Sequence, residues 1–194
     1  VGDVSAFRKE FKADLEVIEY AVAEFELPEN LKISIHSGSD KFSIYKPIKK
    51  LLQETGAGLH IKTAGTTWLE ELHGLILSGK EGLNYARNIY KQALKRIDEL
   101  SAPYADVINI DNKQLPSAAE IEAASAQEFS DMLVNDVNNP NYNIHLRQLL
   151  HLSYKLPAEN LSHYYSLLEN SEDIVADQVT KNIYRHISQI FPEK

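Results

Sequence analysis

The first part of the chain shows hydrophobic spacing of two kinds. Apolar residues recur every three or four positions from Phe7 to Phe25, which predicts an amphipathic helix over residues 5–25 that Pro28 ends. Apolar and polar residues then alternate over residues 31–36, which predicts a strand with a polar last position.

The same two patterns recur downstream. Alternating residues predict further strands at 58–63 and 106–111, and helical spacing lies over 43–55 and from Thr67 onward. Thr67 and Glu70 have the spacing of a capping box, which predicts that a helix starts there. Strands that alternate with helices indicate βα units and a parallel sheet, either a small open sheet or part of a barrel.

After Pro116 the spacing is wholly helical. The predicted helices cover roughly 117–135, 142–155, 158–169 and 172–191.

Composition excludes several classes of protein. The 194 residues are 43% hydrophobic, enough for one domain with a substantial core. A net charge of −8 without a block of Lys and Arg argues against nucleic acid or a membrane surface as partner. The sequence has no cysteine, no long apolar stretch and no signal-peptide pattern, so we expect a cytoplasmic protein.

Polar residues stand at the C-terminal ends of the three predicted strands. His36, His60 and Asp111 share this position, and Lys62 lies two residues after His60 on the same face. Strand ends of parallel sheets are where active sites collect, and this residue set suits a divalent first-row metal ion. Lys62 would supply a positive charge for an anionic group. A structural role for each histidine stays open at this point.

A small-residue loop follows the first strand. Ser37, Ser39 and Asp40, followed by Lys41, can present N–H groups and hydroxyls to a carboxylate or phosphate at a helix N-terminus. The same residues can equally serve as a helix cap.

The remaining candidates are weaker. We expect His73, His163 and His186 on helix surfaces, and Arg147 in a surface or interface position.

Three longer stretches resemble one known family. The segments ISIHSGSDKFSIY, LHIKTAGTTWLEEL and NPNYNIHLRQLLHLSYKL are similar, in order and spacing, to the C-terminal part of the tagaturonate epimerases. The resemblance runs from about residue 30 to the end of the chain.

The resemblance implies a metal-dependent enzyme that interconverts D-tagaturonate and D-fructuronate in hexuronate catabolism. It implies a barrel-like α/β catalytic domain in which His36 and His60 bind a divalent cation such as Zn, Mn, Ni, Co or Fe. Family members are longer, with further catalytic residues upstream. We therefore expect residues 1–194 to be one domain, the C-terminal portion of a TIM-barrel-like enzyme, with βα units over 1–116 and a helical segment over 117–194.

The reaction assigns expected roles to the polar residues. The ligand is expected to be a small-molecule sugar acid; Lys62 and Lys41 would contact its carboxylate or a developing oxyanion, and Asp111 or Asp40 would transfer protons. A homo-oligomer is compatible with the sequence. The alternatives are another metal-dependent sugar isomerase or aldolase, or a non-catalytic helical interaction module.

Overall fold

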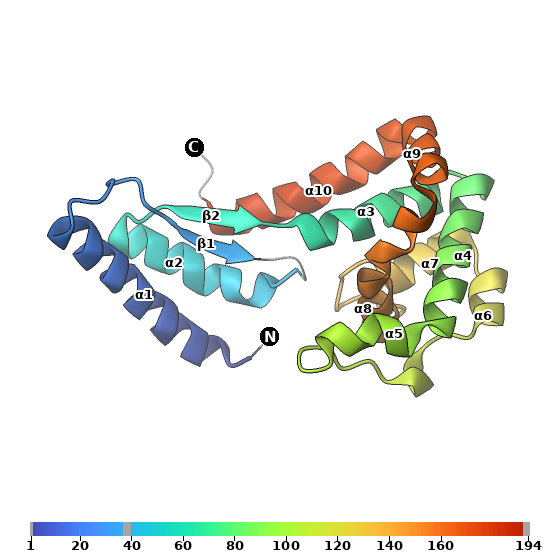
Figure 1. Ribbon diagram of the computed structural model, residues 1–194, viewed down its shortest axis with the longest axis horizontal. Helices are drawn as coiled ribbons and strands as arrows, with labels where there is room; N and C mark the ends of the chain where they lie inside the picture. Colours follow the sequence, from blue (N-terminus) through green and yellow to red (C-terminus); the bar gives the residue numbers. More distant parts are fainter. Residues whose placement is uncertain (1, 37–39, 192–194) are drawn as a thin grey trace. The chain divides into compact units, whose positions relative to one another are not determined.

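A computed structural model describes the backbone of residues 2–36 and 40–191, and the side chains of these residues except 64–66. The described chain is mostly helical (Figure 1). Its strands and α-helices, in order, are α1 (Val4–Glu24), β1 (Ile33–His36), α2 (Tyr45–Thr55), β2 (Leu59–Lys62), α3 (Ala64–Leu77), α4 (Lys80–Lys95), α5 (Ile97–Ser101), α6 (Ala118–Ala123), α7 (Ala126–Leu133), α8 (Ile144–Leu152), α9 (Leu161–Asn170) and α10 (Glu172–Ile190). Short 3₁₀ helices lie at η1 (Phe42–Ile44), η2 (Ala102–Tyr104), η3 (Asn112–Gln114), η4 (Ser153–Lys155) and η5 (Pro157–Asn160).

The predicted TIM-barrel-like α/β fold is wrong. Within the described residues the sheet consists of β1 and β2 alone, paired in parallel, and helices make up most of the rest. The start of α3 also differs from the prediction. The helix begins at Ala64, so Thr67 lies inside it and does not cap it.

The predicted third strand, 106–111, does not form. Its alternation is real, because Ile108 and Ile110 are partly buried against a helical core. The backbone N–H groups of Asn109 and Asp111, however, donate to side chains of α8, Gln148 Oε1 at 3.3 Å and His145 Nδ1 at 3.0 Å. Side chains one helical turn apart thus take the place of a neighbouring strand, and residues 106–107 form a turn that bonds back to Tyr104, so the segment joins no sheet.

The chain divides into two compact units by its internal contacts. Unit 1 comprises Val1–Thr66 and Asn182–Lys194, and unit 2 comprises Thr67–Lys181. The predicted helical segment 117–194 is therefore divided: its part up to Lys181 lies in unit 2 together with most of α3, with α4 and with α5, and its last residues belong to unit 1.

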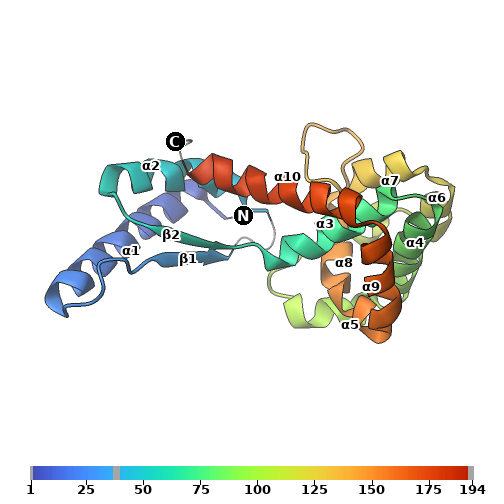
Figure 2. The same ribbon diagram turned by 90° about the horizontal axis from the view of Figure 1, so that it is seen from above.

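Unit 1 packs helices against one face of its two strands, which run side by side in both views (Figures 1 and 2). Its core contains Phe11 and Leu15 of α1, Ile48 of α2, Leu59 of β2 and Ile190 of α10. Helix α2 ends where Gly56 adopts φ 71°, a left-handed conformation that glycine takes without steric cost. The helices thereby cover the isoleucine face of the sheet.

Unit 2 is a helical assembly with its own core. Residues of α3 to α10 contribute to it, and the largest fully buried side chains include Tyr90, Phe129 and Leu146. Ser117 and Ser125 begin α6 and α7 with complete capping boxes to Glu120 and Glu128. Along the described part of the chain, no helix combines the length and the apolar character needed to cross a membrane.

Candidate functional site

Four polar side chains share the outer face of the two-stranded sheet in unit 1. Ser34 is paired with His60, and His36 with Lys62, in a parallel register. Partners in register point to the same side of a sheet, and all four residues are exposed. The two histidines predicted as metal ligands therefore lie on one face, opposite the face that the helices cover.

A serine that the sequence did not single out orients one of these histidines. Ser34 Oγ lies 3.1 Å from His60 Nδ1. A hydrogen bond at Nδ1 fixes the ring and directs Nε2 outward as the nitrogen for an external ligand. Ser34 was missed because the register that pairs it with His60 is not visible in the sequence.

A hydrogen bond joins the C-terminal end of β1 to Lys41. Lys41 Nζ donates a hydrogen bond to the carbonyl oxygen of His36 at 2.7 Å. The predicted substrate-binding residue Lys41 thus lies next to the strand end. Ser37 and Ser39, predicted for the same role, lie outside the described residues.

Asp40 is placed in the core of unit 1 and away from the open face. Its side chain has 0% exposure, and its Oδ1 accepts from Nε2 of His186 at 3.0 Å. The other ring nitrogen of His186 bonds to the Tyr45 hydroxyl. The expectation that His186 lies on a helix surface is wrong, since this histidine is 1% exposed. A proton-transfer role for Asp40 stays a prediction, and its contacts favour a positioning role.

Asp111 belongs to unit 2 and does not end a strand. Its carboxylate accepts from Gln114 Nε2 and from the N–H of Lys113, both at 3.0 Å, and so caps η3. These hydrogen bonds, that of Gln114 first, hold the pKa of Asp111 below its usual value. The prediction that Asp111 ends a strand of the same sheet as the two histidines is therefore wrong, and its role in proton transfer remains a prediction.

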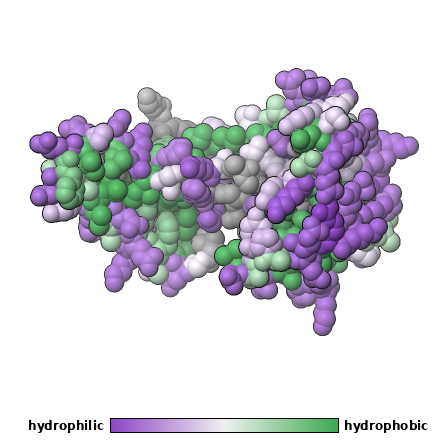
Figure 3. Space-filling view, viewed as in Figure 1, coloured by the Kyte–Doolittle hydropathy of each residue, from purple (hydrophilic) through white to green (hydrophobic). Residues whose placement is uncertain are grey.

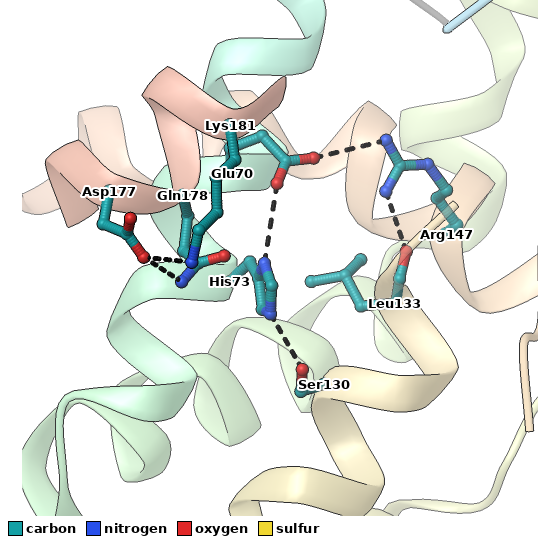
Figure 4. Close-up of polar contacts among 8 residues, drawn as sticks. All are labelled: Glu70, His73, Ser130, Leu133, Arg147, Asp177, Gln178 and Lys181. Carbon is teal, nitrogen blue, oxygen red and sulfur yellow. Dashed lines mark hydrogen bonds and ion pairs between the residues drawn. The ribbon is translucent and has the colours of Figure 1, made fainter. Parts of the chain in front are cut away.

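Unit 2 buries a polar cluster that the sequence did not reveal (Figure 4). Glu70 lies between Arg147 Nη2, 3.7 Å from its Oε1, and His73 Nδ1, 3.5 Å from its Oε2. His73 Nε2 is 2.8 Å from Ser130 Oγ, and Arg147 Nη1 donates to the carbonyl of Leu133 at 2.8 Å. The surface positions expected for His73 and Arg147 are wrong, because helical spacing does not show which polar residues meet partners inside the core.

The donor set on the strand face suits a metal ion only in part. Two imidazoles are good ligands for first-row divalent cations, but a stable site has three or more protein ligands. Among the residues that the structure describes, no three His, Asp or Glu side chains are grouped to hold an ion. Further ligands would have to come from residues outside this set.

Comparisons with known proteins identify the family. The sequence model of the family described as "UxaE: tagaturonate epimerase" matches residues 1–190. A tagaturonate/fructuronate epimerase of Thermotoga maritima is 31% identical over 189 residues, which cover 96% of this chain and 34% of that protein.

Solved structures agree. A glycerol-complexed and a native crystal structure of the fructuronate-tagaturonate epimerase UxaE from Cohnella laeviribosi each superpose with a TM-score of 0.69, at 27% and 26% identity. Each match covers 98% of this chain and 35% of the solved one, so the chain spans about a third of the length of these relatives. The chain belongs to the tagaturonate epimerase family.

Proposed function

We propose that this chain forms part of an enzyme that interconverts D-tagaturonate and D-fructuronate in hexuronate catabolism. Family membership supports this function, together with the names of the Thermotoga and Cohnella relatives. We assign the active site to the exposed face of the sheet because His36, His60 and Lys62 lie together there.

We also propose that the reaction depends on a divalent metal ion held by His36 and His60. With Nδ1 of His60 directed at Ser34, a proton on Nδ1 leaves the Nε2 lone pair for the ion. When bound, such an ion would polarise the substrate ketone and a neighbouring hydroxyl. Its other ligands would come from parts of the enzyme beyond the described residues.

The chemistry constrains what the residues must do. The two ketouronates differ at C4, which is β to the C2 ketone, so enolisation toward C3 does not invert it. Retro-aldol cleavage of the C3–C4 bond leaves its electrons on C3 as an enediolate, while the C4 hydroxyl loses a proton and C4 becomes an aldehyde. Re-addition to the opposite face of this aldehyde gives the epimer. Lys62 is suited to hold the substrate carboxylate during this sequence, and transient oxidation at C4 is the competing route.

Substitution of the two histidines in the full-length protein tests the proposal. His36→Ala and His60→Ala should each lower bound divalent metal and reduce epimerisation at least 10–100-fold, roughly the loss seen even for groups that only support a ligand. The fold should persist because both side chains are exposed. Metal content is measured by elemental analysis and turnover by separating the two ketouronates.

The control is His163→Ala, an exposed histidine of α9 in unit 2. It should leave metal content and turnover unchanged. Normal metal and normal turnover in both His36→Ala and His60→Ala would refute the proposed site.

A further inference from the structure

We propose that His186 is a positioning residue for the strand-end site. On this proposal, which rests on the proposed function, the buried hydrogen bonds among Asp40, His186 and Tyr45 fix the backbone at Asp40 and Lys41 and so set the orientation of His36. The three residues come from separate places in the sequence, since 146 positions separate Asp40 from His186 and 141 separate Tyr45 from it.

The hydrogen-bonding groups of Tyr45, His186 and Asp40 are matched to one another. The Tyr45 hydroxyl is hydrogen-bonded to Nδ1 of His186, and Nε2–H of His186 donates to Oδ1 of Asp40 at 3.0 Å. Tyr45 is fully buried, and the side chains of His186 and Asp40 are 1% and 0% exposed. Water is therefore excluded, and loss of one member leaves the next without its partner.

Aromatic packing holds the imidazole of His186 in place. The Phe42 ring lies with its centroid 4.9 Å from that of His186, and the guanidinium of Arg185 lies 3.9 Å from the Phe42 ring centroid. Ile190, one turn further along α10, is 1% exposed in the same core. The end of α10 thus presents His186 from a rigid support.

Two adjacent residues connect this support to the site. Asp40 is anchored to His186, and its φ of 52° turns the chain sharply, a left-handed conformation that aspartate tolerates when it is held. The next residue, Lys41, donates to the carbonyl of His36 at 2.7 Å. A displacement of Asp40 would therefore move Lys41 and, through it, the last residue of β1.

The polar composition of this core also favours positioning over simple stability. Apolar side chains of similar volume would fill the same space and can stabilise a core at least as well as buried hydrogen-bonded polar groups. A series of hydrogen bonds instead specifies one arrangement, because each donor must lie at the right distance and angle from its acceptor. Accurate placement is what a metal-binding histidine requires.

The test uses three variants of the full-length protein: Tyr45→Phe, His186→Gln and Asp40→Asn. Metal-free protein is titrated with Zn²⁺ and, separately, with Mn²⁺, and kcat and KM are measured at low and at saturating metal. We expect the metal dissociation constant to rise about 10–100-fold in His186→Gln. The activity of this variant should recover largely when metal is in excess. Tyr45→Phe, which retains its ring, should show a smaller change in the same direction.

The matched control is Tyr20→Phe, which removes a hydroxyl from an exposed tyrosine of α1. It should leave both measurements unchanged. Thermal melts on every variant separate loss of folding from loss of positioning. If His186→Gln does not fold, Tyr45→Phe decides the question on its own.

Folded His186→Gln or Tyr45→Phe protein with unchanged metal affinity, alongside His36→Ala protein that loses metal, would overturn the positioning role and leave the proposed function standing. Unchanged metal affinity in His36→Ala would instead refute the metal site, and the positioning role with it.

Discussion

The strand face of unit 1 exposes its polar side chains, whereas the central cluster of unit 2 buries them. In unit 1, four polar residues stand on an exposed strand face, and Figure 3 shows apolar residues gathered over the region of α1 and α2. Val17 and Phe25 of unit 1 have exposures of 64% and 66%. In unit 2, Glu70, His73 and Arg147 lie inside the core, with the Glu70 carboxylate within 3.7 Å of Arg147 and 3.5 Å of His73.

This difference separates residues that are free to meet a ligand from residues whose partners are already supplied. An exposed polar face has little effect on folding, so its composition is open to selection for chemistry. A buried charged group must keep its partners, because an unpaired charge in the core is costly. Substitutions on the strand face should therefore change activity, and substitutions in the buried cluster should change stability.

The largest expected effect lies in the buried cluster. Glu70→Ala removes the carboxylate between Arg147 and His73, so the buried guanidinium of Arg147 loses this ion pair. We expect a loss of about 3–5 kcal/mol in the free energy of unfolding, measured by urea denaturation. Glu169→Ala, an exposed glutamate of α9, is the control and should change stability by less than about 0.5 kcal/mol. A loss below about 1 kcal/mol in Glu70→Ala would contradict this account of the buried pair.

The next effect concerns close packing within unit 2. A Cβ atom added at Gly74 of α3 would lie 2.7 Å from the Cα of Val175 in α10. Gly74→Ala should therefore destabilise the protein by about 1–3 kcal/mol, because backbone atoms cannot rotate away. Gly2→Ala, where no atom lies within 4 Å, provides the comparison. Equal stability of the two variants would show that α10 shifts easily.

On the strand face, Lys62→Met should leave stability unchanged and impair catalysis. The side chain is exposed, so unfolding should change by less than about 0.5 kcal/mol. Loss of a charged contact to the substrate carboxylate should lower kcat/KM about tenfold or more. Lys9→Met on the exposed surface of α1 is the control. An unchanged kcat/KM in Lys62→Met would remove this lysine from the site.

The smallest effect is a dependence on pH in unit 2. Hydrogen bonds to the side chain and backbone of Ser117 lower the pKa of Glu120, and bonds to the backbone and side chain of Ser125 lower that of Glu128. Both values fall below the usual 4.5, so the unfolded chain binds protons first as pH falls. The contribution of these caps is present above pH 4.5 and is lost as pH falls through the lowered values.

Amide hydrogen exchange measured across this range should show α6 and α7 loosening in acid. Glu120→Gln combined with Glu128→Gln retains capping groups that do not titrate, and should reduce this dependence. If the double variant is as sensitive to acid as the native protein, groups other than these two glutamates cause the effect.

Local patterns in the sequence predicted much of the molecule. Helical spacing located α1 and α10 to within a residue or two at each end, and alternation located β1 and β2 together with the side of the sheet that is polar. These features depend on neighbours a few positions apart, which the sequence displays directly.

The tertiary structure decided the features that depend on distant partners. The 106–111 segment alternates like a strand, yet His145 and Gln148 of α8 bind its backbone in place of a second strand. His73 and His186 resemble surface histidines by spacing, yet Ser130 and Asp40 meet them in two separate cores. Periodicity states which face a side chain occupies, whereas hydrogen-bond partners are set by which elements pack together. For this reason the sequence alone determined the two histidines on one strand face, and only the folded chain determined what holds that strand in place.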